Sequence, residues 1–228
     1  MKKLIFMMLS LVLISSMVAC TQPANAAELK SDKPRVTSPA VSATDQAILA
    51  SGNTEFALNL YQLLKTKEGN LFYSPYSISE ALAMTYGGAR GETETQMAEA
   101  MRFQLTQAKL HAAFNSLDIE LDKRGQGAQG TDGKGFRLNV VNAIWGQKDF
   151  KFTPSYLDLL AQNYGAGMRI VDYINQSEPA RQTINQWVSD QTEAKIKDLL
   201  PQGSITPWTR LVLTNAIYFN AAWASQVN

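Results

Sequence analysis

The sequence contains 228 residues, of which 45% are hydrophobic and 18% are charged, so the chain has enough apolar material to bury one sizeable core. Its 21 lysine and arginine residues nearly balance its 20 aspartate and glutamate residues, which gives no reason to expect nucleic-acid binding. A single cysteine excludes an internal disulfide framework, and a single histidine excludes any metal site built from several histidines.

The first 19 residues have the pattern of a secretory signal peptide. A short basic segment, Met1–Lys3, precedes the apolar run Leu4–Ile14, which is interrupted only by Ser10. This run is shorter than the ~20 apolar residues that a transmembrane helix needs. We therefore expect the chain to be exported and not to remain in the membrane as a spanning segment.

Two cleavage points compete after this run. Residues 24–26 suit ordinary signal peptidase, whereas Met17–Cys20 resembles a bacterial lipobox, in which the cysteine becomes lipidated and the new first residue. We favour Cys20, which follows the apolar run closely, although Met17 stands where leucine is usual. Residues 20–44 are then a flexible tether from a lipid anchor in the cell envelope. In the alternative, Cys20 is discarded with the signal peptide and the protein is secreted into the extracellular space.

Helical patterns begin at residue 45. Apolar residues recur at helical spacing through Asp45–Leu64, and Ser77 with Glu80 forms a capping box for the next helix, which Gly87 and Gly88 end. Four more helices are expected over residues 93–101, 110–121, 154–164 and 177–192.

Three strands are expected among these helices, over Phe136–Trp145, Met168–Tyr173 and Arg210–Phe219. The first has apolar residues towards both faces, which indicates a central position in a covered sheet. The last is the most strand-like run of all, yet it contains Asn215. A buried asparagine without hydrogen-bond partners costs roughly 1–3 kcal/mol. We therefore expect polar neighbours around Asn215.

No enzyme signature is present in the sequence. The glycines of a G-x-G-x-x-G match, Gly125, Gly127 and Gly130, follow charged residues instead of an apolar strand, so they indicate a flexible surface loop. His111 is interpreted as a structural or surface residue, because no acid and nucleophile surround it in a motif. We therefore predict no catalytic residue, metal site, cofactor or small-molecule substrate.

Three segments together resemble the serpin family of serine protease inhibitors. They are Asn70–Ile78 with the following Gly88–Thr93, then Ile184–Leu200, and then Leu211–Phe219 closed by Trp223. A weaker fourth match is Asn142–Trp145. The order and spacing of the segments agree with the family across residues 53–223.

This resemblance implies an α+β fold in which helices pack around a large central β-sheet. In the family, a protease cuts an exposed reactive loop and is trapped as an acyl-enzyme while the loop inserts into the sheet as a new strand. The implied partner of the full-length form is a serine or cysteine protease. The resemblance also places Ser74, Ser77 and Asn215 in a polar cluster that controls the opening of the sheet.

The resemblance also implies that part of the family's domain is absent from this chain. In serpins the reactive loop and several strands lie beyond the position that corresponds to Asn228, so residues 45–228 are expected to form an incomplete serpin domain. On this expectation the truncated chain is inactive as an inhibitor, and its target protease cannot be named. The alternative function is a non-inhibitory cell-envelope lipoprotein that uses the remaining domain as a binding surface.

Overall fold

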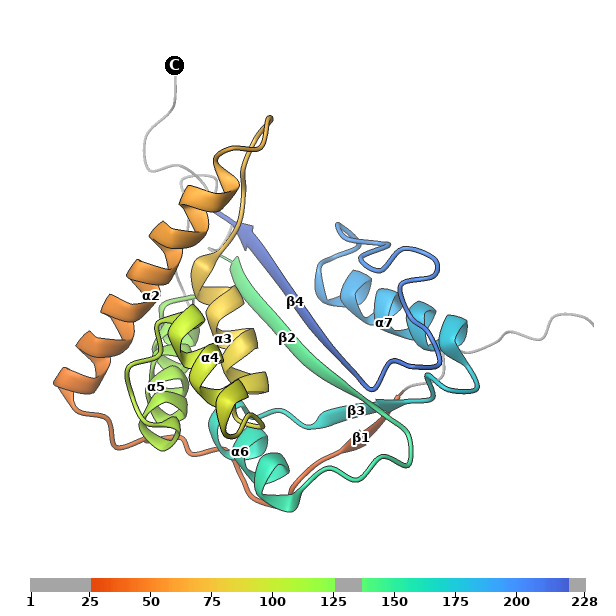
Figure 1. Cartoon of the computed structure of the whole chain (residues 1–228), viewed down its shortest axis with the longest axis horizontal. Coiled ribbons are helices and arrows are strands. Elements are labelled where there is room, and N and C mark those ends of the chain that lie inside the picture. Colours follow the sequence, from red (N-terminus) through yellow and green to blue (C-terminus); the bar gives the residue numbers. More distant parts are fainter. Residues whose placement is uncertain (1–25, 126–136, 222–228) are drawn as a thin grey trace, which may run out of the picture.

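The computed structural model describes residues 26–125 and 137–221 and shows a mixture of helices and strands (Figure 1). The predicted signal peptide, Cys20, Gly127, Gly130 and Trp223 lie outside the described residues. The helices are α2 (Ala43–Leu64), α3 (Pro75–Tyr86), α4 (Glu92–Met101), α5 (Gln107–Gly125), α6 (Pro154–Tyr164) and α7 (Ser177–Gln191). The strands are β1 (Ala27–Leu29), β2 (Arg137–Gln147), β3 (Met168–Val171) and β4 (Leu211–Asn220).

The four strands form one sheet in the order β1-β3-β2-β4. Strand β2 is antiparallel to β4 and parallel to β3, while β1 is antiparallel to β3. The central position predicted for Phe136–Trp145 is therefore confirmed, because β2 has a neighbour on each side. Strand β4 is the outer strand, and the described residues place no further strand beside it.

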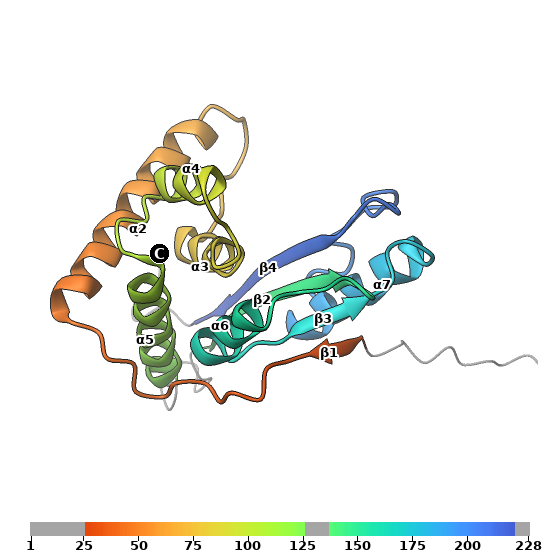
Figure 2. The ribbon, with the colours of Figure 1, turned by 60° about the horizontal axis from the view of Figure 1, so that its bottom comes forward.

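Helices cover both faces of this sheet. On one face, Met84 of α3 and Leu160 of α6 pack with Ile144 and Met168. On the other face, Val188 of α7 packs with strand residues at the β2–β4 pair. Figure 2 shows α2, α3, α4 and α5 grouped together beside the sheet, with α7 apart from them. Among the described residues, no helix has a stretch long and apolar enough to cross a membrane.

Residues 20–44, predicted to be a flexible tether, are attached to the body in their described part, and the last two of them already belong to α2. Ala27–Leu29 pairs with β3 as strand β1. Further along, the Lys33 ammonium lies 2.7 Å from the Asp158 carboxylate of α6, and Arg35 forms an ion pair with Asp118 of α5 at 2.5 Å. The strand pairing uses backbone groups that every sequence carries, so the composition of the segment gives no sign of it.

Candidate functional site

The predicted polar residue Asn215 lies where α3 crosses β2 and β4. Asn142 of β2 is directly opposite Asn215 of β4 in the strand register, and the two side chains are hydrogen-bonded. The Asn215 amide nitrogen lies 2.6 Å from Asn142 Oδ1 and 3.1 Å from the Ser77 carbonyl oxygen, and it also donates to Ser77 Oγ. Asn215 is half-buried, and it has the polar neighbours expected for an asparagine within this strand.

Glu80 extends this cluster, although the sequence analysis did not assign it there. Its Oε2 accepts a hydrogen bond from Asn142 Nδ2 at 2.9 Å, and its Oε1 accepts one from the Tyr76 hydroxyl at 3.1 Å. The side chain is almost fully buried. A continuous polar network thus begins at Tyr76 on α3, passes through Asn142 and Asn215 on the strands, and returns to α3 at Ser77. We call these five residues, including Glu80, the α3–sheet network.

Ser74 lies next to the network, and its local role is that of a helix cap. It is the N-cap of α3, where its Oγ accepts a hydrogen bond from the Ser77 backbone N–H at 3.3 Å. Pro75 follows at the first helical position, where its missing N–H costs nothing and its fixed φ favours the helix. The predicted capping box of Ser77 and Glu80 is therefore wrong, because the helix begins earlier and the Glu80 carboxylate turns to the sheet instead.

The surroundings of the Glu80 carboxyl group favour its protonated form. Burial raises the pKa of Glu80 to about 8, and the negative charge of Asp118 on α5 adds to this increase. Asp122 acts in the same direction, whereas the hydrogen bond from Tyr76 and the positive charge of Arg35 lower the pKa. Burial likewise raises the pKa of Tyr76, so its hydroxyl remains a donor. The network is therefore held together by neutral groups below about pH 8.

Asn142 could have been found from the sequence, since it is an asparagine inside a run that is apolar towards both faces, as Asn215 is. Glu80 carried no such signal. It stands three residues after a serine at the start of a helix, which is typical of a local cap. Its partner Asn142 is 62 residues away along the chain, so only the tertiary structure brings the two together.

His111 belongs to the core and not to this network. It is buried, and its Nδ1 lies 2.7 Å from the Tyr164 hydroxyl oxygen. Burial, with a smaller effect of the positive charge of Arg90, lowers the pKa of His111 to about 4, so the ring is neutral. This position agrees with the structural role expected for it. Within residues 26–125 and 137–221, no three histidine, cysteine, aspartate or glutamate side chains are arranged to hold a metal ion.

Comparison with known proteins identifies relatives over most of the chain. The family model described as Serpin (serine protease inhibitor) matches residues 51–228. Leukocyte elastase inhibitor A from Mus musculus is 43% identical over 177 residues, which cover 77% of this chain and 44% of the mouse protein. Leukocyte elastase inhibitor from Homo sapiens is 42% identical over 177 residues and the same shares of the two chains. The chain thus spans less than half the length of these relatives.

The fold is similar to that of solved serpin structures. Ovalbumin from the emu, Dromaius novaehollandiae, superposes with a TM-score of 0.68 at 28% identity, covering 78% of this chain and 48% of ovalbumin. Serpin-12 from Manduca sexta superposes with a TM-score of 0.63 at 27% identity, covering 74% of this chain and 44% of that protein. The matched segments, the sheet and the helices around it agree: this chain belongs to the serpin family.

Proposed function

We propose that the protein to which these residues belong inhibits serine proteases by inserting a cleaved reactive loop into its sheet, and that this chain supplies the receiving edge of that sheet. Family membership and the relatives named leukocyte elastase inhibitor support the proposal. The observation that carries it is the combination of an outer strand, β4, with the α3–sheet network attached to that strand.

Strand β4 is suited to receive a new strand. It pairs with β2 on one side over ten residue pairs, from Arg137 with Asn220 to Gly146 with Leu211. Its backbone groups on the other side can form a second ladder with an added segment, which is the usual mode of strand addition. Recognition through the backbone makes this edge tolerant of the inserted sequence.

The α3–sheet network would resist movement of this strand. For β4 to shift over α3, the hydrogen bonds between Asn215 and Ser77 must break and form again, and if its paired strand β2 moves with it, so must the bond between Asn142 and Glu80. A buried hydrogen bond contributes about 1 kcal/mol to stability, while an unsatisfied group costs about 1–3 kcal/mol. A few such bonds can therefore raise the free-energy barrier to opening of the sheet and still allow the sheet to open.

The test uses the product of the complete gene. It is mixed with serine proteases of elastase, chymotrypsin and trypsin specificity, and the products are separated under denaturing conditions. We expect a covalent complex with at least one protease and a matching loss of protease activity. The 228-residue chain alone is the control and should leave protease activity unchanged, since the resemblance places the reactive loop beyond Asn228. Cleavage of the full product without any complex would favour the non-inhibitory alternative.

For the amino terminus we propose export and attachment to the cell envelope through a lipid on Cys20, supported by the lipobox-like Met17–Cys20. Replacement of the cysteine tests this directly. Cys20→Ala should move the protein from the membrane fraction to the soluble fraction, whereas Ser10→Ala, within the apolar run, should not. Retention of Cys20→Ala in membranes would contradict lipidation.

A further inference from the structure

One end of the sheet carries exposed apolar side chains. Strands β2 and β3 are parallel and both end there, whereas the antiparallel strand β4 begins there. The Gln147 N–H donates to the Arg210 carbonyl oxygen at 3.0 Å, which joins the end of β2 to the turn before β4. The next amide, Lys148 N–H, donates to the Val171 carbonyl oxygen of β3 at 2.8 Å. The exposed apolar side chains on and next to these turns, which we call the apolar sheet end, are Phe150, Ile174, Trp208 and Leu211.

Trp208, of which 84% is exposed, lies on an ordered turn. The Thr206 hydroxyl accepts a hydrogen bond from the Trp208 N–H at 3.3 Å, and the Thr209 hydroxyl accepts one from the Thr206 N–H at 3.1 Å. The Arg210 guanidinium donates to the Thr209 carbonyl oxygen at 2.9 Å, and buried Ile205 attaches the turn to the core. An indole on such a turn can dock without first ordering the backbone, which lowers the entropic cost of binding.

The chain leaves the body towards its amino terminus at this same end. Ala27 of β1 pairs with Ile170 of β3, and the antiparallel direction leads the chain back past Val171 towards the apolar sheet end. Ala26 packs against the core cluster that contains Val171. Figure 1 shows the beginnings of β1 and β4 at one end of the sheet. Cys20 precedes Ala26 by only a few residues, so a lipid on Cys20 would bring this end of the sheet to the bilayer.

The apolar sheet end is surrounded by more positive than negative charge. The cationic side chains there are Lys148, Lys151 and Arg210, and the carboxylates are Asp149 and Asp172. None of the three cations forms an ion pair within the part of the chain that the structure describes. The Asp172 carboxylate, in contrast, already accepts hydrogen bonds from neighbouring amides. The cations therefore suit the phosphate groups of a lipid surface.

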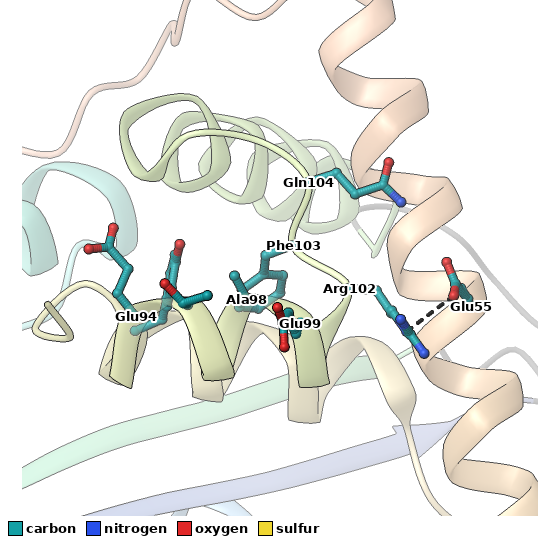
Figure 3. A pocket seen from close by; sticks show the side chains of 9 residues that line it. Glu55, Glu94, Ala98, Glu99, Arg102, Phe103 and Gln104 are labelled. Carbon is teal, nitrogen blue, oxygen red and sulfur yellow. Dashed lines mark ion pairs between the residues drawn. The ribbon is translucent and has the colours of Figure 1, made fainter. Parts of the chain in front are cut away.

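The side of the molecule formed by α2 and α4 has the opposite charge. A pocket of about 500 Å³ between these helices and the turn after α4 is lined by the glutamates Glu55, Glu94 and Glu99 and by Arg102 (Figure 3). The charge of Arg102 is balanced by its ion pair with Glu55 at 3.1 Å, so Glu94 and Glu99 leave this side acidic. An anionic lipid surface would repel the acidic side and attract the cations of the sheet end, which favours one orientation of the molecule.

We propose that the apolar sheet end contacts the surface of a lipid bilayer. Trp208 would lie at the level of the lipid headgroups, where tryptophan is favoured because it combines an apolar ring with a polar N–H group. Phe150 would lie at the boundary with the acyl chains, and Lys148 and Lys151 would lie against lipid phosphates. In the cell this proposal rests on the lipid proposed for Cys20, which brings the two surfaces together, but the contact itself is tested without that lipid.

The test uses the product of the complete gene from residue 20 onwards with Cys20→Ala, which carries neither signal peptide nor lipid. Its binding to vesicles of phosphatidylcholine with about one third phosphatidylglycerol is measured by flotation. We expect reversible binding, which Trp208→Ala should weaken by about tenfold. In vesicles of brominated lipid the tryptophan emission should be quenched, and Trp208→Phe should lose most of this quenching. No binding of the parent, or equal quenching in Trp208→Phe, would overturn the inference.

Phe72→Ala is the matched control for Trp208→Ala. Phe72 is also highly exposed, at 81%, but it lies in the segment between α2 and α3. Figure 1 and Figure 2 both show this segment far from the beginning of β4. Phe72→Ala should therefore leave vesicle binding unchanged. Equal weakening by the two variants would show general adhesion of exposed apolar side chains and would contradict a contact through the apolar sheet end.

The double variant Lys148→Gln with Lys151→Gln tests the contribution of charge. It should weaken binding to the anionic vesicles by at least about fivefold and leave binding to pure phosphatidylcholine unchanged. An equal loss on both kinds of vesicle would contradict the contact between these lysines and lipid phosphates. If the protein carried no lipid on Cys20, vesicle binding would still decide the present inference, so the two proposals fail separately. Protease trapping by Trp208→Ala should equal that of the parent.

Discussion

The two faces of the sheet are attached to their helices by different chemistry. On the α7 face, Trp145 and Trp187 meet edge to face at 5.5 Å, and buried Ile184 packs beside them. On the α3 face, at the same strands, Asn142 and Asn215 connect to α3 by hydrogen bonds. Successive side chains of a strand point to opposite faces of the sheet, so neighbouring residues of one strand contact different helices. The α7 face depends on apolar packing, which is lost when the helix and the strands separate. The α3 face depends on hydrogen bonds, whose donors and acceptors can pair again in a new position.

The largest effect is expected on the α7 face. Ile184→Ala removes a fully buried side chain from the cluster around Trp145 and should lower the free energy of unfolding by about 2–5 kcal/mol. Because no ionisable group is lost, the decrease should be the same across about pH 5 to 9. Urea denaturation at several pH values measures it. If the loss of unfolding free energy in Ile184→Ala changed with pH, the α7 face would not be held by apolar packing alone.

On the α3 face, Glu80→Gln should remove a pH dependence. The unfolded chain loses the Glu80 proton near the ordinary pKa of 4.5, whereas the folded chain keeps it to about pH 8. Between these values the native protein loses stability as the pH rises, by up to about 1.4 kcal/mol per pH unit from this group. The glutamine variant can accept from Asn142 with its amide oxygen and donate from its amide nitrogen to the Tyr76 hydroxyl oxygen, which reverses that bond, and it should lack this slope in urea midpoints. The exposed Glu92→Gln should retain it, and equal slopes in Glu80→Gln and the parent would contradict the assignment.

A smaller effect is expected from Ser77→Ala, which removes the hydroxyl acceptor of Asn215 and should cost about 1–2 kcal/mol. Its specific sign is faster hydrogen exchange of the backbone amides of β4 around Asn215. Ser74→Ala is the matched control, because loss of the N-cap costs a similar amount, about 0.5–2 kcal/mol, without touching Asn215. Equal acceleration of exchange in both variants would mean that the α3–sheet network does not restrain β4.

The smallest effect is expected at Arg169, whose guanidinium carbon lies 4.9 Å from the ring centroid of Trp187 and 5.6 Å from that of Trp145. Arg169→Gln should lower the free energy of unfolding by about 0.5–2 kcal/mol and change the tryptophan fluorescence. Arg169→Lys keeps the charge and should recover part of the loss. Equal losses of unfolding free energy in the two variants would indicate that Arg169 stabilises the fold by packing and not by its charge.

The sequence predicted the parts of the fold that local patterns determine. Strands β2 and β4 follow from their continuous apolar runs, and the need of Asn215 for polar partners follows from its place in such a run. Glu80 could not be assigned, because a local capping pattern and a distant tertiary partner compete for the same carboxylate. Strand β1 could not be predicted either, since its pairing with β3 depends on backbone groups and on an edge formed more than a hundred residues later.

Strand β1 also limits how far the body can lie from the amino terminus. An extended chain spans at most about 3.5 Å per residue. A free tether from Cys20 to Asp45 would reach roughly 85 Å. With Ala27 paired to Ile170 of β3, only the seven residues after Cys20 remain, or about 25 Å of reach. If Cys20 carries the lipid proposed above, strand β1 would hold the β1–β3 side of the sheet within this distance of the bilayer surface.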